Sequence, residues 1–286
     1  MSDSTNCGVI GGGRYVRMYL KFEKIKHAII SFTFLMITIS GCASFPNPTR
    51  ITATPLVTAT FIPTPPSAIV LVVTPLSPSL TPELSDYAFP SSIDSTKRYL
   101  FYLHGKIIED QGLPAISPDF GEYEYVAILE KLRENGFVVI SEERAKNTDS
   151  LEYAKRVAGQ ITQLLEAGVP DQNITVLGAS KGAGIAIDVS HLLENPEINF
   201  VILAICAPET VREFIQSQVT LYGKVLSIYD SRDSLAGSCQ DLFAFSVGKG
   251  LARYNEIVLS IGTGHGILYK PLDAWIVPTI QWAQKP

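Results

Sequence analysis

The sequence lacks an excess of basic residues. It has 23 Lys and Arg against 28 Asp and Glu, which gives a formal net charge of −5 over 286 residues. Proteins that bind nucleic acids neutralise phosphates with clustered Lys and Arg, so this balance argues against nucleic acid as a partner. Charged residues make up only 18% of the chain and hydrophobic residues 46%. This composition excludes a chain that is disordered throughout and leaves enough apolar material for a folded core.

Cysteine is scarce as well. The chain has four Cys, with no CxxC pair and no cluster of Cys and His at metal-ligand spacing. Structural zinc sites are built from such clusters. We therefore expect no metal site, and we expect the protein to work without a cofactor.

No apolar run near the N-terminus is long enough for a comfortable membrane span. The uncharged run Ala28–Ser40 would form about 20 Å of helix, short of the roughly 30 Å of a hydrocarbon core. Lys21, Lys24 and Lys26 precede it, and Ile39-Ser40-Gly41-Cys42 ends it. This order resembles the export signal and lipobox of bacterial lipoproteins, which implies cleavage before Cys42 and its lipidation. An uncleaved signal anchor is the alternative.

Proline is unevenly distributed, with 9 of the 18 Pro between residues 46 and 82. Because Pro fixes φ and removes an N–H donor, this stretch favours an extended, solvated chain. The chain therefore divides into an export signal at 1–41, a lipidated Cys42 with a tether over 42–84, and a folded domain at 85–286. Met18 is an alternative start of the signal. We expect an exported protein, anchored to the extracytoplasmic face of a bacterial membrane, with the bilayer as a partner.

From residue 85 onward, apolar runs rich in β-branched residues alternate with helical patterns. The expected strands are Arg98–Leu103, Phe137–Ser141, Ile174–Leu177, Phe200–Cys206, Lys224–Tyr229 and Glu256–Ile261. The expected helices are Tyr123–Asn135, 150–167, Lys181–Leu193, Pro208–Ser217, Gln240–Val247 and Leu272–Trp282. Continuous apolar runs are typical of parallel strands that are buried on both faces. The alternation predicts a three-layer α/β domain with a mostly parallel sheet of about six strands.

A short motif follows the middle strand of this series. Gly178-Ala179-Ser180-Lys181-Gly182 comes directly after Ile174–Leu177 and opens a helix. It fits G-x-S-x-G, in which a sharp turn flanked by Gly178 and Gly182 presents the Ser hydroxyl above the sheet. The N-terminus of the following helix favours negative charge at that point. Ser180 is thus a candidate nucleophile.

Three further segments resemble the α/β-hydrolase superfamily, and the resemblance covers Arg98–Trp282. Tyr102–Lys106 ends the first strand like the His-Gly loop of that family. Asp233 follows the second strand beyond the elbow, with Asp230 where the family usually has Gly, and either carboxylate can be the acid. His265 follows the last strand in a Gly-rich loop. The order Ser, Asp, His is the one that this fold uses.

The resemblance implies a serine esterase or related acyl hydrolase that acts on a small ester. Ser180 would attack the carbonyl carbon, with His265 as the base that takes its proton. Asp233 is the preferred acid, which would orient the imidazole. The backbone N–H groups of Lys106 and Lys181 would stabilise the oxyanion.

Other charged residues fall on the same edge of the predicted sheet. The side chains of Lys106 and Lys181 are expected to be solvated cations. The alternative is that both point inward, where they would favour an anionic acyl or leaving group. Glu109, Asp110 and Arg144 are expected on loops at the carboxyl ends of strands, and no role is assigned to them.

Two departures from the family pattern concern size. Little chain separates the tether from the first strand, so the first two strands of the family should be missing. About 18 residues lie between Cys206 and Lys224, enough for a helix but not for a lid domain. Export also places the thiols of Cys206 and Cys239 in a compartment that permits disulfides, and we predict that they pair.

Two other interpretations stay open. The domain could keep the hydrolase fold without a working triad and serve as a binding lipoprotein. The Gly-rich turn also resembles T-G-x-x-x-G-x-G of NAD(P)-dependent short-chain dehydrogenases. That family, however, places the turn after its first strand and a Tyr-x-x-x-Lys pair downstream of it. Here the pair Tyr102 and Lys106 lies upstream.

Overall fold

The computed structural model describes residues 84–285. The predicted signal at 1–41, Cys42 and the tether up to residue 83 lie outside this range and stay predictions. Within the described part of the chain, no helix combines the length and the apolar character needed to cross a bilayer.

A parallel six-stranded sheet forms the centre of the domain, in the order β4-β1-β5-β6-β7-β8. Its strands are β1 (Arg98–Leu103), β4 (Phe137–Ile140), β5 (Ile174–Ala179), β6 (Asn199–Leu203), β7 (Gly223–Asp230) and β8 (Leu251–Leu259). β1, β5, β6 and β7 are buried along almost their whole length, as their continuous apolar sequences require. The predicted α/β class with about six parallel strands is confirmed.

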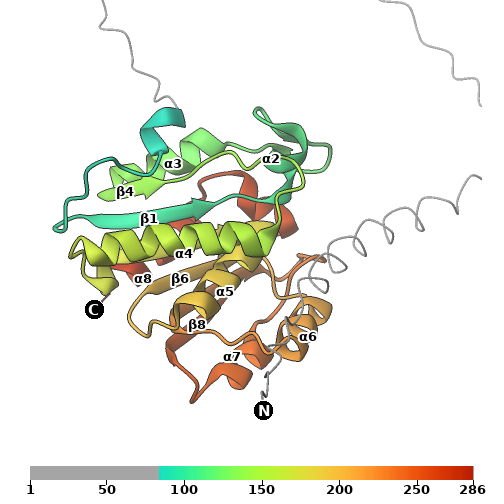
Figure 1. Ribbon diagram of the computed structural model, residues 1–286. Coiled ribbons are helices and arrows are strands. Elements are labelled where there is room, and N and C mark those ends of the chain that lie inside the picture. The colour runs from blue at the N-terminus through green and yellow to red at the C-terminus, as the bar shows by residue number, and fades with distance from the viewer. Residues whose placement is uncertain (1–83, 286) are drawn as a thin grey trace, which may run out of the picture. The chain divides into compact units, whose positions relative to one another are not determined.

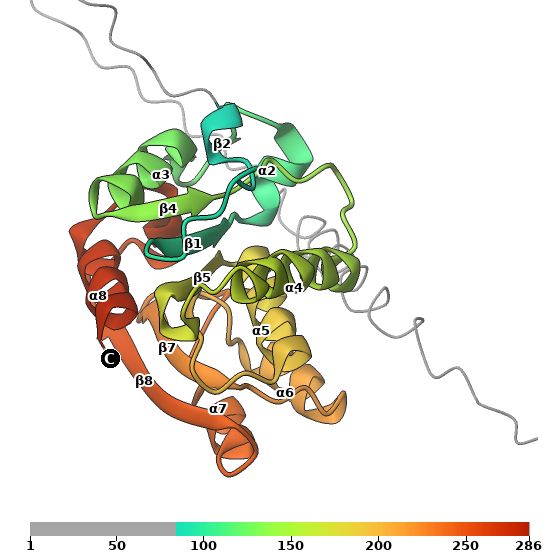
Figure 2. The same cartoon turned by 60° about the vertical axis from the view of Figure 1, so that its left-hand side comes forward.

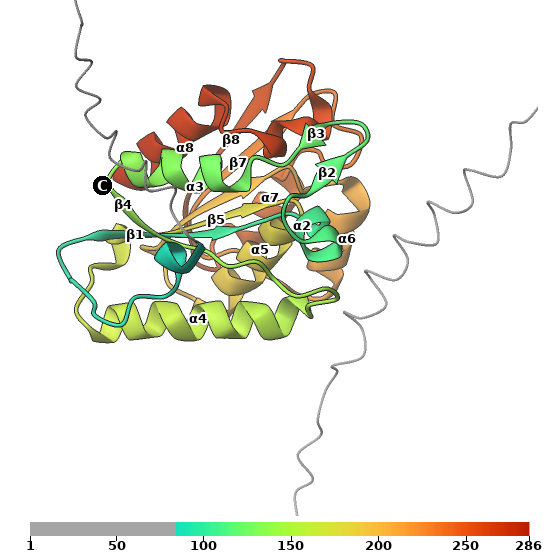
Figure 3. The same ribbon diagram turned by 90° about the horizontal axis from the view of Figure 1, so that it is seen from above.

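Helices cover both faces of the sheet. They are α2 (Lys106–Gln111), α3 (Tyr125–Glu134), α4 (Ser150–Glu166), α5 (Lys181–Leu193), α6 (Pro208–Gln216), α7 (Gln240–Ser246) and α8 (Asp273–Gln284). The long helix α4 runs across the front of the sheet in Figure 1. Figure 2 and Figure 3 separate the layers, with α4 and α5 on one side and α3 and α8 on the other. The arrangement is the predicted three-layer α/β fold.

Two parts of the fold differ from the sequence-based expectation. The chain between β1 and α3 forms α2 and a small hairpin of β2 (Ile116–Ser117) and β3 (Gly121–Glu122), neither of which was predicted. Glu109 and Asp110 therefore lie on a helix and not on a loop. β8 begins at Leu251, five residues before the predicted Glu256. The prediction missed these residues because β8 is an edge strand, and its first half lacks the continuous apolar run of a buried strand.

One core cluster lies between the sheet and helices α3 and α8. It includes Leu100 and Tyr102 of β1, Leu129 of α3, and Trp275 and Ile276 of α8. Because all six strands are parallel, the loops that follow them meet at one edge of the sheet. The strand order reverses between β1 and β5, and such a switch point is where ligands bind in open α/β sheets.

Candidate active site

Ser180 alone makes the turn between β5 and α5. Its backbone angles are φ 52° and ψ −116°, a combination that is costly for a residue with a side chain. The turn is held by the Ser180 N–H, which donates to the carbonyl oxygen of Leu203 at 2.9 Å. This conformation lifts the side chain off the carboxyl end of β5, at the switch point of the sheet.

The two glycines of the motif are required by close backbone approach. A Cβ on Gly178 would overlap the carbonyl oxygen of Gly182, and a Cβ on Gly182 would overlap the carbonyl oxygen of Leu103. Without side chains at both positions, the first turn of α5 packs directly onto β5 and β1. The spacing of the glycines therefore reflects the geometry of the turn.

The structure brings Ser180, His265 and Asp233 together in one hydrogen-bonded chain. Ser180 Oγ lies 3.0 Å from Nε2 of His265, and Nδ1 of the same ring lies 2.8 Å from Oδ2 of Asp233. The Asp233 side chain is 0% exposed and the His265 side chain 13%. With the Nδ1 proton donated to the carboxylate, Nε2 is left to accept the hydroxyl proton.

Asp230 has a different place from the one expected for an acid of the triad. Its carboxylate accepts hydrogen bonds from the backbone N–H groups of Arg232 at 2.8 Å, Ile261 at 3.1 Å and Gly262 at 3.0 Å. Burial raises the pKa of Asp230, but the backbone donors outweigh it and hold the pKa below its ordinary value. Asp230 thus ties the turn that carries Asp233 to the loop before the imidazole. Asp230 is the last residue of β7 and Asp233 comes three residues later, so the sequence alone could not separate their contacts.

The loop after β1 approaches Ser180 from the other side. A Cβ built on Gly105 would lie 3.8 Å from the Cβ of Ser180. Lys106 and Lys181 are the first residues of α2 and α5. Their N–H groups belong to helix N-termini, where the backbone dipole favours negative charge.

His104, next to this loop, is fully buried, and its hydrogen bonds give it a structural role. Its Nδ1–H donates to the Gly105 carbonyl at 2.8 Å, and its Nε2 accepts the backbone N–H of Arg144 at 2.9 Å. Burial, helped by the charge of Arg144, lowers the pKa of His104 well below its ordinary value. His104 is therefore neutral and fixes the loop.

The two lysines at the helix starts behave differently. The Lys106 amine pairs with Asp110 at 2.6 Å, and these side chains stay 39% and 37% exposed. The expectation of a solvated cation is wrong for Lys181, whose Nζ contacts Glu109 Oε2 at 2.5 Å and the Thr148 carbonyl at 2.8 Å. Burial lowers the pKa of Lys181, and Glu109 opposes part of that shift.

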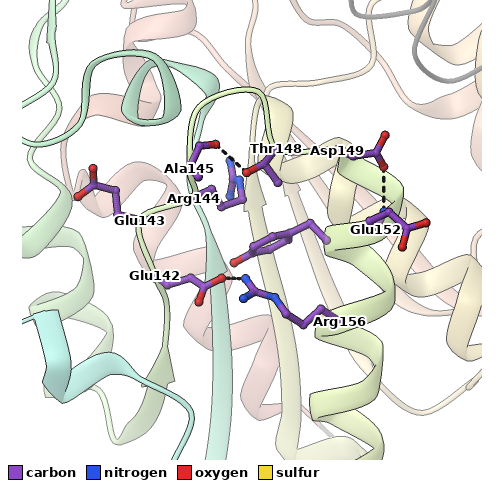
Figure 4. A pocket seen from close by; sticks show the side chains of 9 residues that line it. Glu142, Glu143, Arg144, Ala145, Thr148, Asp149, Glu152 and Arg156 are labelled. Atoms are coloured by element: carbon purple, nitrogen blue, oxygen red, sulfur yellow. Dashed lines mark hydrogen bonds and ion pairs between the residues drawn. The ribbon is translucent and has the colours of Figure 1, made fainter.

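A pocket of about 510 Å³ opens beside this region, between the loop after β4 and the start of α4. Figure 4 shows the Glu142–Arg156 ion pair at its edge, and the Tyr153 ring has the guanidinium groups of Arg144 and Arg156 5.3 and 4.5 Å from its centre. Ser180 does not line it, so this pocket is separate from the hydrogen-bonded chain.

Two other features bear on the expectations from sequence. Cys206 and Cys239 form a disulfide with a Cα–Cα distance of 5.1 Å. The bond links the loop after β6 to the N-terminus of α7, just beyond the turn of Asp233. Among residues 84–285, no group of three or more His, Cys, Asp and Glu is arranged to hold a metal ion.

The geometry does not favour the short-chain dehydrogenase interpretation. The Gly-rich turn follows the third strand of the parallel sheet along the chain and not the first. The Tyr102 hydroxyl is buried and bonds the Tyr123 hydroxyl at 2.6 Å, while the Lys106 amine pairs with Asp110 on the surface. Tyr102 and Lys106 therefore point their polar groups to different partners.

No protein-family model and no curated protein matches the chain. Among solved structures, Arabidopsis thaliana SOBER1 is similar at 17% identity and TM-score 0.41, over 66% of this chain and all of that one. A putative dienelactone hydrolase from Klebsiella pneumoniae is similar at 10% identity and TM-score 0.46, over 69% of this chain and 90% of that one. Esterase PE8 is similar at 15% identity and TM-score 0.41, over 68% and 95%.

Proposed function

We propose that this protein is a serine hydrolase that cleaves carboxylic esters or related acyl bonds through an acyl-enzyme intermediate. The observation that supports this most strongly is the unbroken chain from Asp233 through His265 to the hydroxyl of Ser180. A Ser hydroxyl is a weak nucleophile until a base removes its proton during the attack. The strained turn at Ser180 and the two obligatory glycines beside it are consistent with a side chain that must be presented in one orientation.

The reaction would proceed in two halves. Ser180 Oγ attacks the carbonyl carbon while His265 Nε2 takes its proton, which gives a tetrahedral oxyanion. The intermediate collapses to the acyl-enzyme, and the imidazolium returns that proton to the departing alkoxide. Water then attacks the acyl group with the same ring as base, which releases the acid and restores Ser180.

Two groups would stabilise the charges that appear. The buried carboxylate of Asp233 keeps the proton on Nδ1 and stabilises the imidazolium. The N–H groups of Lys106 and Lys181 would hold the oxyanion at the N-termini of α2 and α5, where one such donor is worth roughly 3–4 kcal/mol.

Export and anchoring through Cys42 form the second part of the proposal. The disulfide between Cys206 and Cys239 favours it, since disulfides persist mainly in oxidising compartments. Expressed with its signal in a bacterium, the protein should enter the detergent phase and take up a lipid label. Cys42→Ser should abolish both, and unchanged partitioning of this variant would contradict the anchor.

Hydrolysis of p-nitrophenyl esters of graded acyl length tests the activity. The domain should hydrolyse at least the short esters, and Ser180→Ala should not. Asp110→Asn is a matched control, because it alters an exposed side chain on α2. A well-folded domain that hydrolyses no ester and takes up no fluorophosphonate would favour the binding lipoprotein, and an ester-hydrolysing Ser180→Ala would contradict the mechanism.

A further inference from the structure

Three ionised side chains are buried together behind the loop that follows β1. Glu109 lies between Arg144 and Lys181, with its Oε1 2.7 Å from Arg144 Nε and its Oε2 2.5 Å from Lys181 Nζ. The side chains are 1%, 0% and 7% exposed. Burying charges is expensive unless each one is paired and hydrogen-bonded, so a cluster of this kind is a strong geometric constraint on its members.

The three residues come from separate segments of the chain, and no covalent bond fixes the distances between these segments. Glu109 belongs to α2, Arg144 to the loop after β4, and Lys181 is the first residue of α5. Arg144 also donates its backbone N–H to His104 Nε2, and its guanidinium reaches the His104 carbonyl oxygen. The cluster therefore holds α2, the loop after β1 and the start of α5 as one unit.

The positions within this unit matter for the chemistry. Glu109 lies one helical turn after Lys106, and its partner Lys181 is the residue whose own N–H opens α5. The carboxylate of Glu109 thus connects the two helix N-termini whose N–H groups would bind the oxyanion. Within residues 84–285, the exposed neighbour Asp110 forms its ion pair along its own helix, with Lys106, and does not bridge α2 to α5.

We propose that Glu109 is a positioning residue for the oxyanion site, which fixes the N-termini of α2 and α5 so that both N–H groups converge on the substrate carbonyl oxygen. The inference rests on the proposed hydrolase function. Glu109 does not touch the substrate and acts through the backbone at Lys106 and Lys181. Hydrogen bonds to an oxyanion depend steeply on placement, and a displacement of about 1 Å can lower a rate by roughly 100-fold.

Glu109→Gln tests the proposal, with Asp110→Asn as the matched control on the same helix. The amide keeps the shape of the side chain but removes the charge that holds both cations. We expect kcat on p-nitrophenyl acetate to fall about 10- to 100-fold while KM changes by less than about 3-fold, because the lost interaction acts mainly in the transition state. Asp110→Asn should leave both constants at the values of the unaltered protein.

A boronic acid provides a readout that a purely structural role would not move. It adds to a nucleophilic Ser and places a negatively charged oxygen where the oxyanion forms, so its affinity for Glu109→Gln should fall in parallel with kcat. Melting curves identify the folded fraction, and Glu109→Asp, which keeps the charge on a shorter side chain, replaces Glu109→Gln if that variant does not fold. It should show the same parallel loss.

The outcomes separate this inference from the proposed function. If the unaltered protein hydrolyses esters and folded Glu109→Gln, or Glu109→Asp in its place, keeps kcat and boronate affinity, Glu109 is structural and the inference is overturned. If both quantities fall together at constant KM, it is supported. If the unaltered protein neither hydrolyses esters nor binds the boronate, the hydrolase function fails, and the inference fails with it.

Discussion

The two sides of Ser180 are held by different kinds of interaction. We call the side of Ser180 that holds His265 the base side. There, Asp233 accepts from the His265 imidazole and Asp230 from backbone N–H groups, and in the described structure neither carboxylate has a Lys or Arg side chain as a donor. We call the opposite side, with the N-termini of α2 and α5, the oxyanion side. There, Glu109 contacts the buried cations of Arg144 and Lys181. The first side is built from neutral donors and the second from ion pairs.

The difference follows the charge that each side must accommodate in the proposed reaction. The imidazole becomes positive during catalysis, so a neighbouring carboxylate free of cation partners stabilises it most. The carbonyl oxygen becomes negative, and the cluster behind it, with one carboxylate and two cations, carries a net positive charge. Preorganised charge of the right sign on each side costs no rearrangement when the reaction occurs.

The largest effect on kcat should come from removing the proposed nucleophile, Ser180, or its base, His265. Ser180→Ala and His265→Ala should each lower kcat by about 10⁵- to 10⁶-fold, and the double variant should lose hardly more, because nucleophile and base act as one unit. Single-turnover kinetics on an activated ester would measure this. Additive losses in the double variant would show that the two side chains work independently.

The next effect separates the two carboxylates of the base side. Asp233→Asn should lower kcat by about 10⁴-fold, because the amide favours the wrong tautomer of the imidazole. Asp230→Asn should keep far more activity and instead lose about 1–3 kcal/mol of unfolding free energy, since its oxygens accept backbone N–H groups. Kinetics and urea unfolding on both variants check this. The reverse pattern would make Asp230 the acid.

A third prediction concerns another buried carboxyl, that of Asp188 in α5. Burial, with a smaller contribution from Asp149, raises the pKa of Asp188 in α5 from 3.8 to about 7. Between these pH values the folded state binds more protons than the unfolded state, so stability falls as pH rises from about 4 to 7. Asp188→Asn removes this loss, on the order of 4 kcal/mol.

Urea unfolding of Asp188→Asn and the unaltered protein at several pH values measures that difference. The two should be similarly stable near pH 4, and the variant should be more stable above pH 7. A stability difference that does not change with pH would show that Asp188 ionises normally despite its burial.

The smallest effect on kcat should come from removing the disulfide, which tests whether the segment that carries Asp233 needs a covalent link. The double variant Cys206→Ser with Cys239→Ser should lose about 3–4 kcal/mol of unfolding free energy, the chain-entropy value for a separation of 33 residues. Its kcat should change little at low temperature, because Asp230 still holds the two loops. A large loss of kcat with native stability would show that the disulfide itself orients Asp233.

Much of the fold could be predicted from the sequence, because local signals specify it. The bounds of β1 and α5 agree with the structure. The start of α4 also has a local cause, because the Asp149 side chain accepts the Glu152 N–H at 2.9 Å. The helix α2 escaped prediction because its six residues are too few for a periodic signal. The first half of β8 escaped because an exposed edge strand lacks the apolar run of a buried one.

In the site too, local sequence patterns predict some residues and miss others. Ser180, Asp233 and His265 could be proposed from motif and order, since each follows a predicted strand. The link between Glu109 and Lys181 spans 72 residues and depends on how α2 turns its side chains, which no local pattern encodes. The inward direction of the Lys181 side chain was mistaken for the same reason.

Labelling with a fluorophosphonate tests the central claim, that His265 activates Ser180, most directly. The probe phosphonylates an activated Ser with loss of fluoride, and mass spectrometry of peptides locates the adduct. We expect one adduct per chain, at Ser180, with no labelling of Ser180→Ala and labelling of His265→Ala slowed by orders of magnitude. An adduct on another residue, or equal labelling rates for His265→Ala and the unaltered protein, would contradict it.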